Sequence, residues 1–259
     1  MTRLGLTATR TAICTAFCLG GFSAAAVAQR GPAPAAIHLP QDVLALACAP
    51  VATFDMPPRP LRVTGGQDEV ERRTYAPGDL VTINAGANNG IEVGQEYFVR
   101  RVLADGHREV SRKNPGNIRT VGWLRVYAID KDMSLATISY ACETIDAGDY
   151  LEPFVMPVVP TPAADAPRPQ RSNYAHIMFG ADGRRSFGQS DFFVIDHGSD
   201  HGVMPGARFV VYHDKQVAGN FLYEVGEAVA VDVRSETSTL QVTLSRSSLT
   251  AGDYVAIRK

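Results

Sequence analysis

Short apolar segments with strand-like patterns recur along the chain and are separated by turn-forming residues. Their side chains alternate with period two or are rich in β-branched and aromatic types, and no long segment has the 3.6-residue period of a helix. The sequence therefore predicts an all-β fold. The predicted strands lie at 80–83, 96–102, 121–129 and 135–140, and again at 175–179, 192–195, 209–212, 225–233, 239–244 and 254–257.

One glycine-rich segment occurs twice. Residues 83–94 read Ile-Asn-Ala-Gly-Ala-Asn-Asn-Gly-Ile-Glu-Val-Gly, and 112 positions later residues 195–206 read Ile-Asp-His-Gly-Ser-Asp-His-Gly-Val-Met-Pro-Gly. Glycine permits positive φ without a Cβ clash, so the shared spacing predicts one backbone shape in both places. The glycines concerned are Gly86, Gly90 and Gly94 in the first segment and Gly198, Gly202 and Gly206 in the second.

The correspondence extends beyond these turns. The same offset aligns the Arg-Arg pair at 72–73 with the pair at 184–185, and an offset of 104 aligns Ala-Gly-Asp-Tyr at 147–150 with 251–254. The change of offset places eight extra residues of the first half between Val99 and Val121. Loops tolerate insertions and strands do not, so the pattern predicts duplication of one folded unit.

The predicted organisation is two similar β domains in tandem, at 61–154 and 173–259. Several strands within about 90 residues favour a small antiparallel barrel or a two-sheet sandwich, because closing a sheet removes its free edges. Prolines concentrate outside the domains, which predicts an extended arm at 29–60 and a Pro-rich linker at 155–172. Within the arm, 42–47 predicts one or two helical turns.

Residues 1–28 have the layout of a secretory signal peptide. Arg3 and Arg10 precede an apolar run at 12–19, and the segment ends in Ala-Val-Ala before Gln29. The pattern predicts export to the periplasm or cell envelope, with the membrane met only in transit. The alternative, a membrane anchor, requires about 20 apolar residues.

Charge and cysteine content limit the range of candidate functions. The formal net charge of −2 does not favour binding of nucleic acid through bulk charge. Outside 1–28 the cysteines are Cys48 and Cys142, and an even pair in an exported chain indicates one disulfide. The alternative is two buried thiols that do not meet.

The acidic and histidine residues of the second turn are the candidates for chemistry. His197 and His201 have a spacing that holds zinc when it falls on a helix, but here it falls in the glycine turn. Aspartates at 79, 149, 191 and 253 recur at strand ends, where capping explains them. No Gly-x-Ser-x-Gly motif is present. We expect no enzymatic activity and no cofactor; the alternative is a secreted hydrolase or metal-dependent enzyme that uses this Asp/His turn.

The insertion in the first half is basic. In an acidic chain it predicts a positive hairpin that contacts an envelope protein or an anionic envelope polymer, the alternative being a solvated loop. Trp123, which follows Gly122 in a predicted strand, is expected in the core and not as a platform for stacking sugars. The candidate contact residues are Arg100, Arg101, Arg108, Arg112, Lys113 and Arg119.

The spaced turn glycines, the later Val-Gly strand at 121–122 and the closing Ala-Gly-Asp-Tyr at 147–150 together resemble a β module of exported bacterial envelope proteins. Such modules include the C-terminal domain of flagellar assembly protein T and the segments that accompany LysM peptidoglycan-binding domains. The resemblance covers both repeats and implies a periplasmic, non-catalytic structural or binding role.

Overall fold

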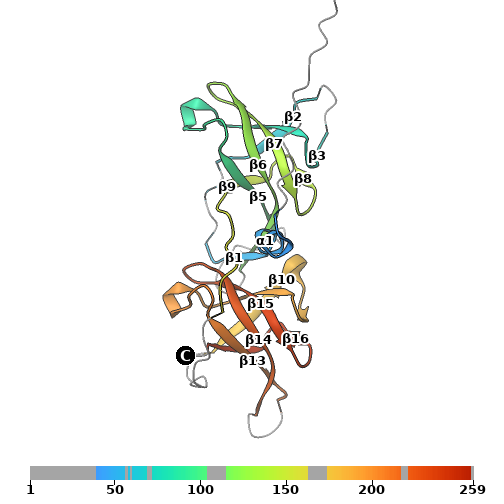
Figure 1. Cartoon of the computed structure of the whole chain (residues 1–259), viewed down its shortest axis with the longest axis vertical. Coiled ribbons are helices and arrows are strands. Elements are labelled where there is room, and N and C mark those ends of the chain that lie inside the picture. The colour runs from blue at the N-terminus through green and yellow to red at the C-terminus, as the bar shows by residue number, and fades with distance from the viewer. Residues whose placement is uncertain are drawn as a thin grey trace, which may run out of the picture. The chain divides into compact units, whose positions relative to one another are not determined.

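A computed structural model describes residues 39–55, 58, 60–68, 72–103, 115–162, 174–216 and 221–257. Contacts divide the chain into the units 1–35 and 36–259, and every described residue belongs to the second unit. The predicted signal peptide lies outside the described residues. Figure 1 shows that strands dominate this unit, which bears out the all-β prediction.

The segment before the first repeat is ordered at 39–54. It forms α1 (Gln41–Ala47), close to the predicted helical turns, and β1 (Val51–Thr53), which pairs antiparallel with β6. Ala47 packs against Phe98 and Trp123, and Val51 packs against Ile118. The prediction of an extended arm is therefore wrong here, because apolar side chains spaced between the prolines bury themselves on the adjacent sheet.

A disulfide joins Cys48, at the end of α1, to Cys142, just after β7. The two Cα atoms are 5.8 Å apart, within the usual range for a disulfide. The predicted disulfide is therefore present, and it ties α1 to the sheet on which it packs.

The first half contains a seven-stranded antiparallel sheet. Its path is β2-β4-β7-β6-β5-β9, with β1 added on β6. The two ends of this path are also bonded: Leu151 N–H donates to Leu61 O and Val63 N–H to Asp149 O, both at 3.0 Å. The strands are β2 (Val63–Gly66), β4 (Leu80–Ile83), β5 (Glu96–Leu103), β6 (Gly116–Ile129), β7 (Ser134–Ala141) and β9 (Tyr150–Pro153), and a separate pair is β3 (Thr74–Tyr75) with β8 (Ile145–Asp146).

The second half contains a closed six-stranded barrel in the order β10-β12-β15-β14-β13-β17, with β10 and β17 also paired. Of the two predicted architectures, the barrel is therefore the one found in this half. Its strands are β10 (Ala175–Gly180), β12 (Phe192–Ile195), β13 (Arg208–Asp214), β14 (Leu222–Val233), β15 (Ser238–Ser245) and β17 (Tyr254–Ile257), and a separate pair is β11 (Ser186–Phe187) with β16 (Leu249–Thr250). Three-residue 3₁₀ helices are η1 (Ala87–Asn89), η2 (Ala181–Gly183) and η3 (Ser199–His201).

Two main apolar cores form among the described residues. One includes Ile83 and Val99, and the other includes Ile195 and Val211; the two clusters share no described residue. Trp123 is 3% exposed and stacks on Tyr140 with ring centroids 4.6 Å apart. The prediction that this tryptophan lies in a core is therefore confirmed.

Candidate functional site

The two predicted glycine turns have closely similar backbones. Gly90 and Gly202 close η1 and η3 in the left-handed region, with φ of 78° and 80°. A Cβ added to Gly86 would lie 2.2 Å from Asp130 O, and one added to Gly198 would lie 2.2 Å from Arg234 O. Only glycine allows both the turn and this close approach. Gly94 and Gly206 also have positive φ, of 89° and 82°.

The same hydrogen bonds hold both turns against the neighbouring β-hairpin. Ala87 N–H donates to Asp130 O at 2.9 Å, and Ser199 N–H donates to Arg234 O at 2.8 Å. Further along each turn, Gly94 N–H donates to Val126 O at 2.9 Å and Gly206 N–H to Ala230 O at 2.8 Å. Each turn therefore clamps the connection between two long strands, β6–β7 or β14–β15.

The recurring aspartates cap strand ends. Each carboxylate accepts a hydrogen bond from the backbone N–H three residues earlier, a common arrangement in turns. Their first role is therefore to fix the turns. The four bonds are Ala76 N–H to Asp79 at 2.9 Å, Gly188 N–H to Asp191 at 2.9 Å, Asp146 N–H to Asp149 at 2.8 Å and Thr250 N–H to Asp253 at 2.8 Å.

The histidines of the second turn lie close together, with ring centroids 4.2 Å apart for His197 and His201. His201 Nδ1 accepts from Gly198 N–H at 3.3 Å, the place that Asn89 Oδ1 takes for Gly86 N–H at 3.2 Å. His201 thus does in the second half what an asparagine does in the first. Among the described residues, no group of three or more His, Cys, Asp or Glu side chains is arranged to hold a metal ion.

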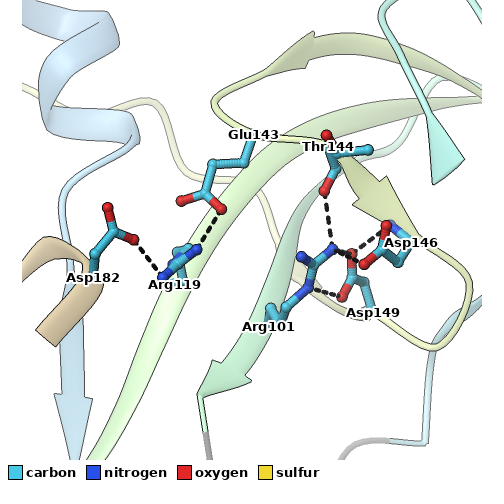
Figure 2. Close-up of polar contacts among 7 residues, drawn as sticks. All are labelled: Arg101, Arg119, Glu143, Thr144, Asp146, Asp149 and Asp182. Carbon is cyan, nitrogen blue, oxygen red and sulfur yellow. Dashed lines mark hydrogen bonds and ion pairs between the residues drawn. The ribbon is translucent and has the colours of Figure 1, made fainter.

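Arg101 is the centre of a polar cluster in the first half, shown in Figure 2. Its guanidinium donates two hydrogen bonds to the Asp149 carboxylate, from Nε at 2.8 Å and from Nη2 at 2.7 Å. Nη2 also donates to Thr144 O at 2.9 Å and forms an ion pair with Asp146 at 2.9 Å. The hydrogen bonds to Asp149 raise the pKa of Arg101 against the opposing effect of burial. The bidentate geometry makes this a strong, directional contact.

The other two arginines of the predicted basic hairpin that the structure describes are also engaged. Arg119 pairs with Glu143 at 2.5 Å and with Asp182, as Figure 2 shows. Arg100 is buried, bonds to Glu152 at 3.2 Å, and has its pKa lowered by burial. The prediction of an exposed contact surface therefore does not hold for Arg100, because the sheet buries it. Arg108, Arg112 and Lys113 lie outside the described residues.

Two kinds of surface feature were missed from the sequence. A cleft of about 670 Å³ in the first half is lined by Gly66, Arg73 and Asp146, among others. Large apolar side chains are exposed at several strand ends, including Tyr127, Met133 and Phe221. The signal for Tyr127 was present in the sequence: β6 alternates, and Tyr127 falls in the same phase as the polar Arg125.

Comparison of the sequence with protein-family models and with curated proteins finds no match. Within the described part of the chain, α1 is the one α-helix, and no helix has the length and apolar character needed to span a bilayer.

Proposed function

We propose that this protein is an exported, non-catalytic binding or assembly module of the bacterial cell envelope, built from two copies of one β domain. The observation that carries the proposal is the repetition of shape: the two glycine turns have the same left-handed glycines and the same backbone hydrogen bonds. The polar residues of these turns maintain the backbone in both halves, which suits a scaffold.

Matching irregularities support the duplication. The β5–β6 ladder changes register between Val99 and Arg100, and the β13–β14 ladder changes register between Val211 and Tyr212, 112 positions on. The β6–β7 ladder has two further register shifts. The β14–β15 ladder has the same two shifts at positions 104 residues later in the chain. Bulges are specific features, and three of them at equivalent positions favour common descent over independent closure of two sheets.

Close approaches of the backbone match as well. A Cβ on Gly122 would lie 2.3 Å from Tyr140 O, and one on Gly226 would lie 2.5 Å from Leu244 O. The side chains of Ile145 and Leu249, again 104 positions apart, would each lie 3.1 Å from the Cβ added to the corresponding glycine. The shared constriction supports the proposal that each half closes a core of its own.

Export is supported by the signal-like pattern of 1–28 and by the disulfide. Disulfides persist in oxidising compartments and are rare in the cytosol, so the Cys48–Cys142 bond suits the periplasm. The resemblance of both repeats to envelope β modules agrees with this location.

The partner is proposed to be an envelope protein or an anionic envelope polymer that binds the β5–β6 connection. Arg108, Arg112 and Lys113 belong to this connection, which the eight inserted residues make longer than its counterpart in the second half. Because Arg100, Arg101 and Arg119 are engaged within the chain, the proposal rests on the three other basic residues of the predicted hairpin.

Crosslinking in envelope fractions tests the proposal. The full chain is exported and treated with a crosslinker, and we expect covalent adducts with envelope components that weaken in the R112E/K113E variant while the melting temperature stays within about 2 °C. The R73E/R185E variant makes the same change in charge elsewhere and should keep the adducts. A wild-type chain that stays in the cytosol, or forms no envelope adduct, would contradict the proposal.

A further inference from the structure

A short segment, residues 49–53, contacts both halves of the chain. On one side, its strand β1 pairs antiparallel with β6 of the first half. On the other side, its carbonyl oxygens accept two hydrogen bonds from the second half: the Thr237 hydroxyl donates to Ala52 O at 2.9 Å, and the Thr239 hydroxyl donates to Pro50 O at 2.7 Å. We call residues 49–53 the clasp, because one segment holds to two sheets.

The contacts of the clasp are buried. Val51 and Ala52 are 4% and 1% exposed, and Thr237 and Thr239 are 3% and 1% exposed. A hydroxyl or carbonyl group that lost its partner here would remain largely out of reach of water, and an unsatisfied buried polar group is costly. The two hydrogen bonds therefore favour the arrangement in which the second half stays on the clasp.

Two ion pairs also join the halves. Arg119 in β6 pairs with Asp182 in η2, as Figure 2 shows. Glu152 in β9 lies 3.8 Å from Arg234, which directly follows β14, and also pairs with the buried Arg100 at 3.2 Å. Exposed ion pairs add little stability, but complementary charges favour one orientation of two surfaces over others. These pairs therefore support the same arrangement of the halves as the hydrogen bonds of the clasp.

The disulfide fastens the clasp to the first half. Cys48 directly precedes the clasp, and its partner Cys142 directly follows β7. The other contacts of the clasp there include the three-residue ladder of β1 and the packing of α1 beside it. Such short elements are marginal by themselves. Both cysteines are partly exposed, so a small dithiol can reach the bond between them.

We propose that the clasp fixes the second half on the first, and that the Cys48–Cys142 disulfide acts as a redox switch for this arrangement. A dithiol reductant supplies two electrons and two protons: the bond between the sulfurs breaks, both cysteines become thiols, and the dithiol closes to its own disulfide. Reduction loosens the clasp, and the second half separates from the first while the linker still joins them. The clasp contains none of the residues assigned to the envelope contact, so the switch does not depend on the proposed partner.

Cutting the linker tests the clasp. In the full chain, a recognition sequence for a site-specific protease replaces residues 165–171, the folded protein is cut there, and association of the two fragments is measured by sedimentation velocity. We expect the fragments to remain one complex at micromolar concentrations. T237V/T239V should weaken their association at least tenfold, because buried hydrogen bonds are lost. T64V/T82V is the matched control and should associate like wild type, since these two hydroxyls bond each other within the first half.

Reduction tests the switch. Treatment of the cut wild type with a dithiol should weaken association of the fragments at least tenfold, and the C48A/C142A variant should show the same weakening without reductant. Circular dichroism of the uncut proteins should keep the strand signal in both cases. Wild-type fragments that separate before reduction would overturn the clasp. Fragments that bind equally well after full reduction, or a reduced chain that unfolds as a whole, would overturn the switch.

Discussion

Single glycines hold the two long hairpins in shape. Gly122 and Gly226 lie where the backbone of the next strand passes within 2.5 Å of an added Cβ, so a methyl group there requires the strands to move. We expect Gly122→Ala and Gly226→Ala each to lower the free energy of unfolding by about 1–3 kcal/mol, measured by urea denaturation. Gly188→Ala is the control, because its nearest contact is 4.0 Å away. Equal effects at all three positions would contradict the close packing.

Tyr150 makes stability depend on alkaline pH. Burial, followed by the charge and hydrogen bond of Glu152, raises the pKa of Tyr150 above its ordinary value. Above about pH 10 the unfolded chain releases this proton while the native state retains it, so the free energy of unfolding falls as pH rises.

Replacing the phenol isolates this effect. At pH 8 the free energy of unfolding of Tyr150→Phe should be about 1 kcal/mol lower than that of the wild type, because the hydrogen bond to Glu152 is lost. Between pH 9.5 and 11 the free energy of unfolding, measured by denaturant titration, should fall less in this variant than in the wild type. Tyr127→Phe, at an exposed position, should follow the wild-type curve. An unchanged alkaline slope in Tyr150→Phe would show that another group is responsible.

At the scale of elements, α1 and β1 depend on the disulfide. The helix has seven residues and no side-chain cap, and isolated helices of this length are marginal in water. Closing a loop of 94 residues is worth on the order of 4 kcal/mol in the chain-entropy account. The C48A/C142A variant should therefore lose about 2–4 kcal/mol, and reductant should destabilise the wild type but leave this variant unaffected. A wild-type protein whose free energy of unfolding is unchanged after full reduction would contradict this role.

The sequence predicts elements well where a pattern is local. All ten predicted strands are present, because alternation and β-branched residues report a half-buried strand directly. The glycine turns were predicted because a backbone position with positive φ favours glycine, and glycine is visible in the sequence. The strand β1 was missed: three residues among prolines carry too little pattern, and its pairing with Ile118 spans more than sixty residues.

The contact surfaces illustrate the same limit. Which arginines remain free depends on distant acids, as for Arg101 with Asp149, 48 positions away. The exposure of Met133 and the burial of Thr237 differ because residues 50–52 cover one site and leave the other open. No local pattern encodes which of two equivalent sites is covered, so this difference emerges only from the fold.

The whole molecule has two separate main cores among its described residues. Ile83 and Ile195 are equivalent, fully buried and members of different clusters. Replacing either residue by alanine should lower the free energy of unfolding by about 2–5 kcal/mol. The half that contains the replacement should open more often than the other half, because local opening depends on local packing.

Native-state hydrogen exchange on the matched variants Ile83→Ala and Ile195→Ala tests this most directly. We expect amides of β4–β7 to exchange about 30-fold faster or more in Ile83→Ala while β12–β15 keep wild-type protection, and the reverse in Ile195→Ala; about 30-fold corresponds to 2 kcal/mol. Equal loss of protection in both halves of both variants would mean a single cooperative core, and would contradict the account of two duplicated β domains.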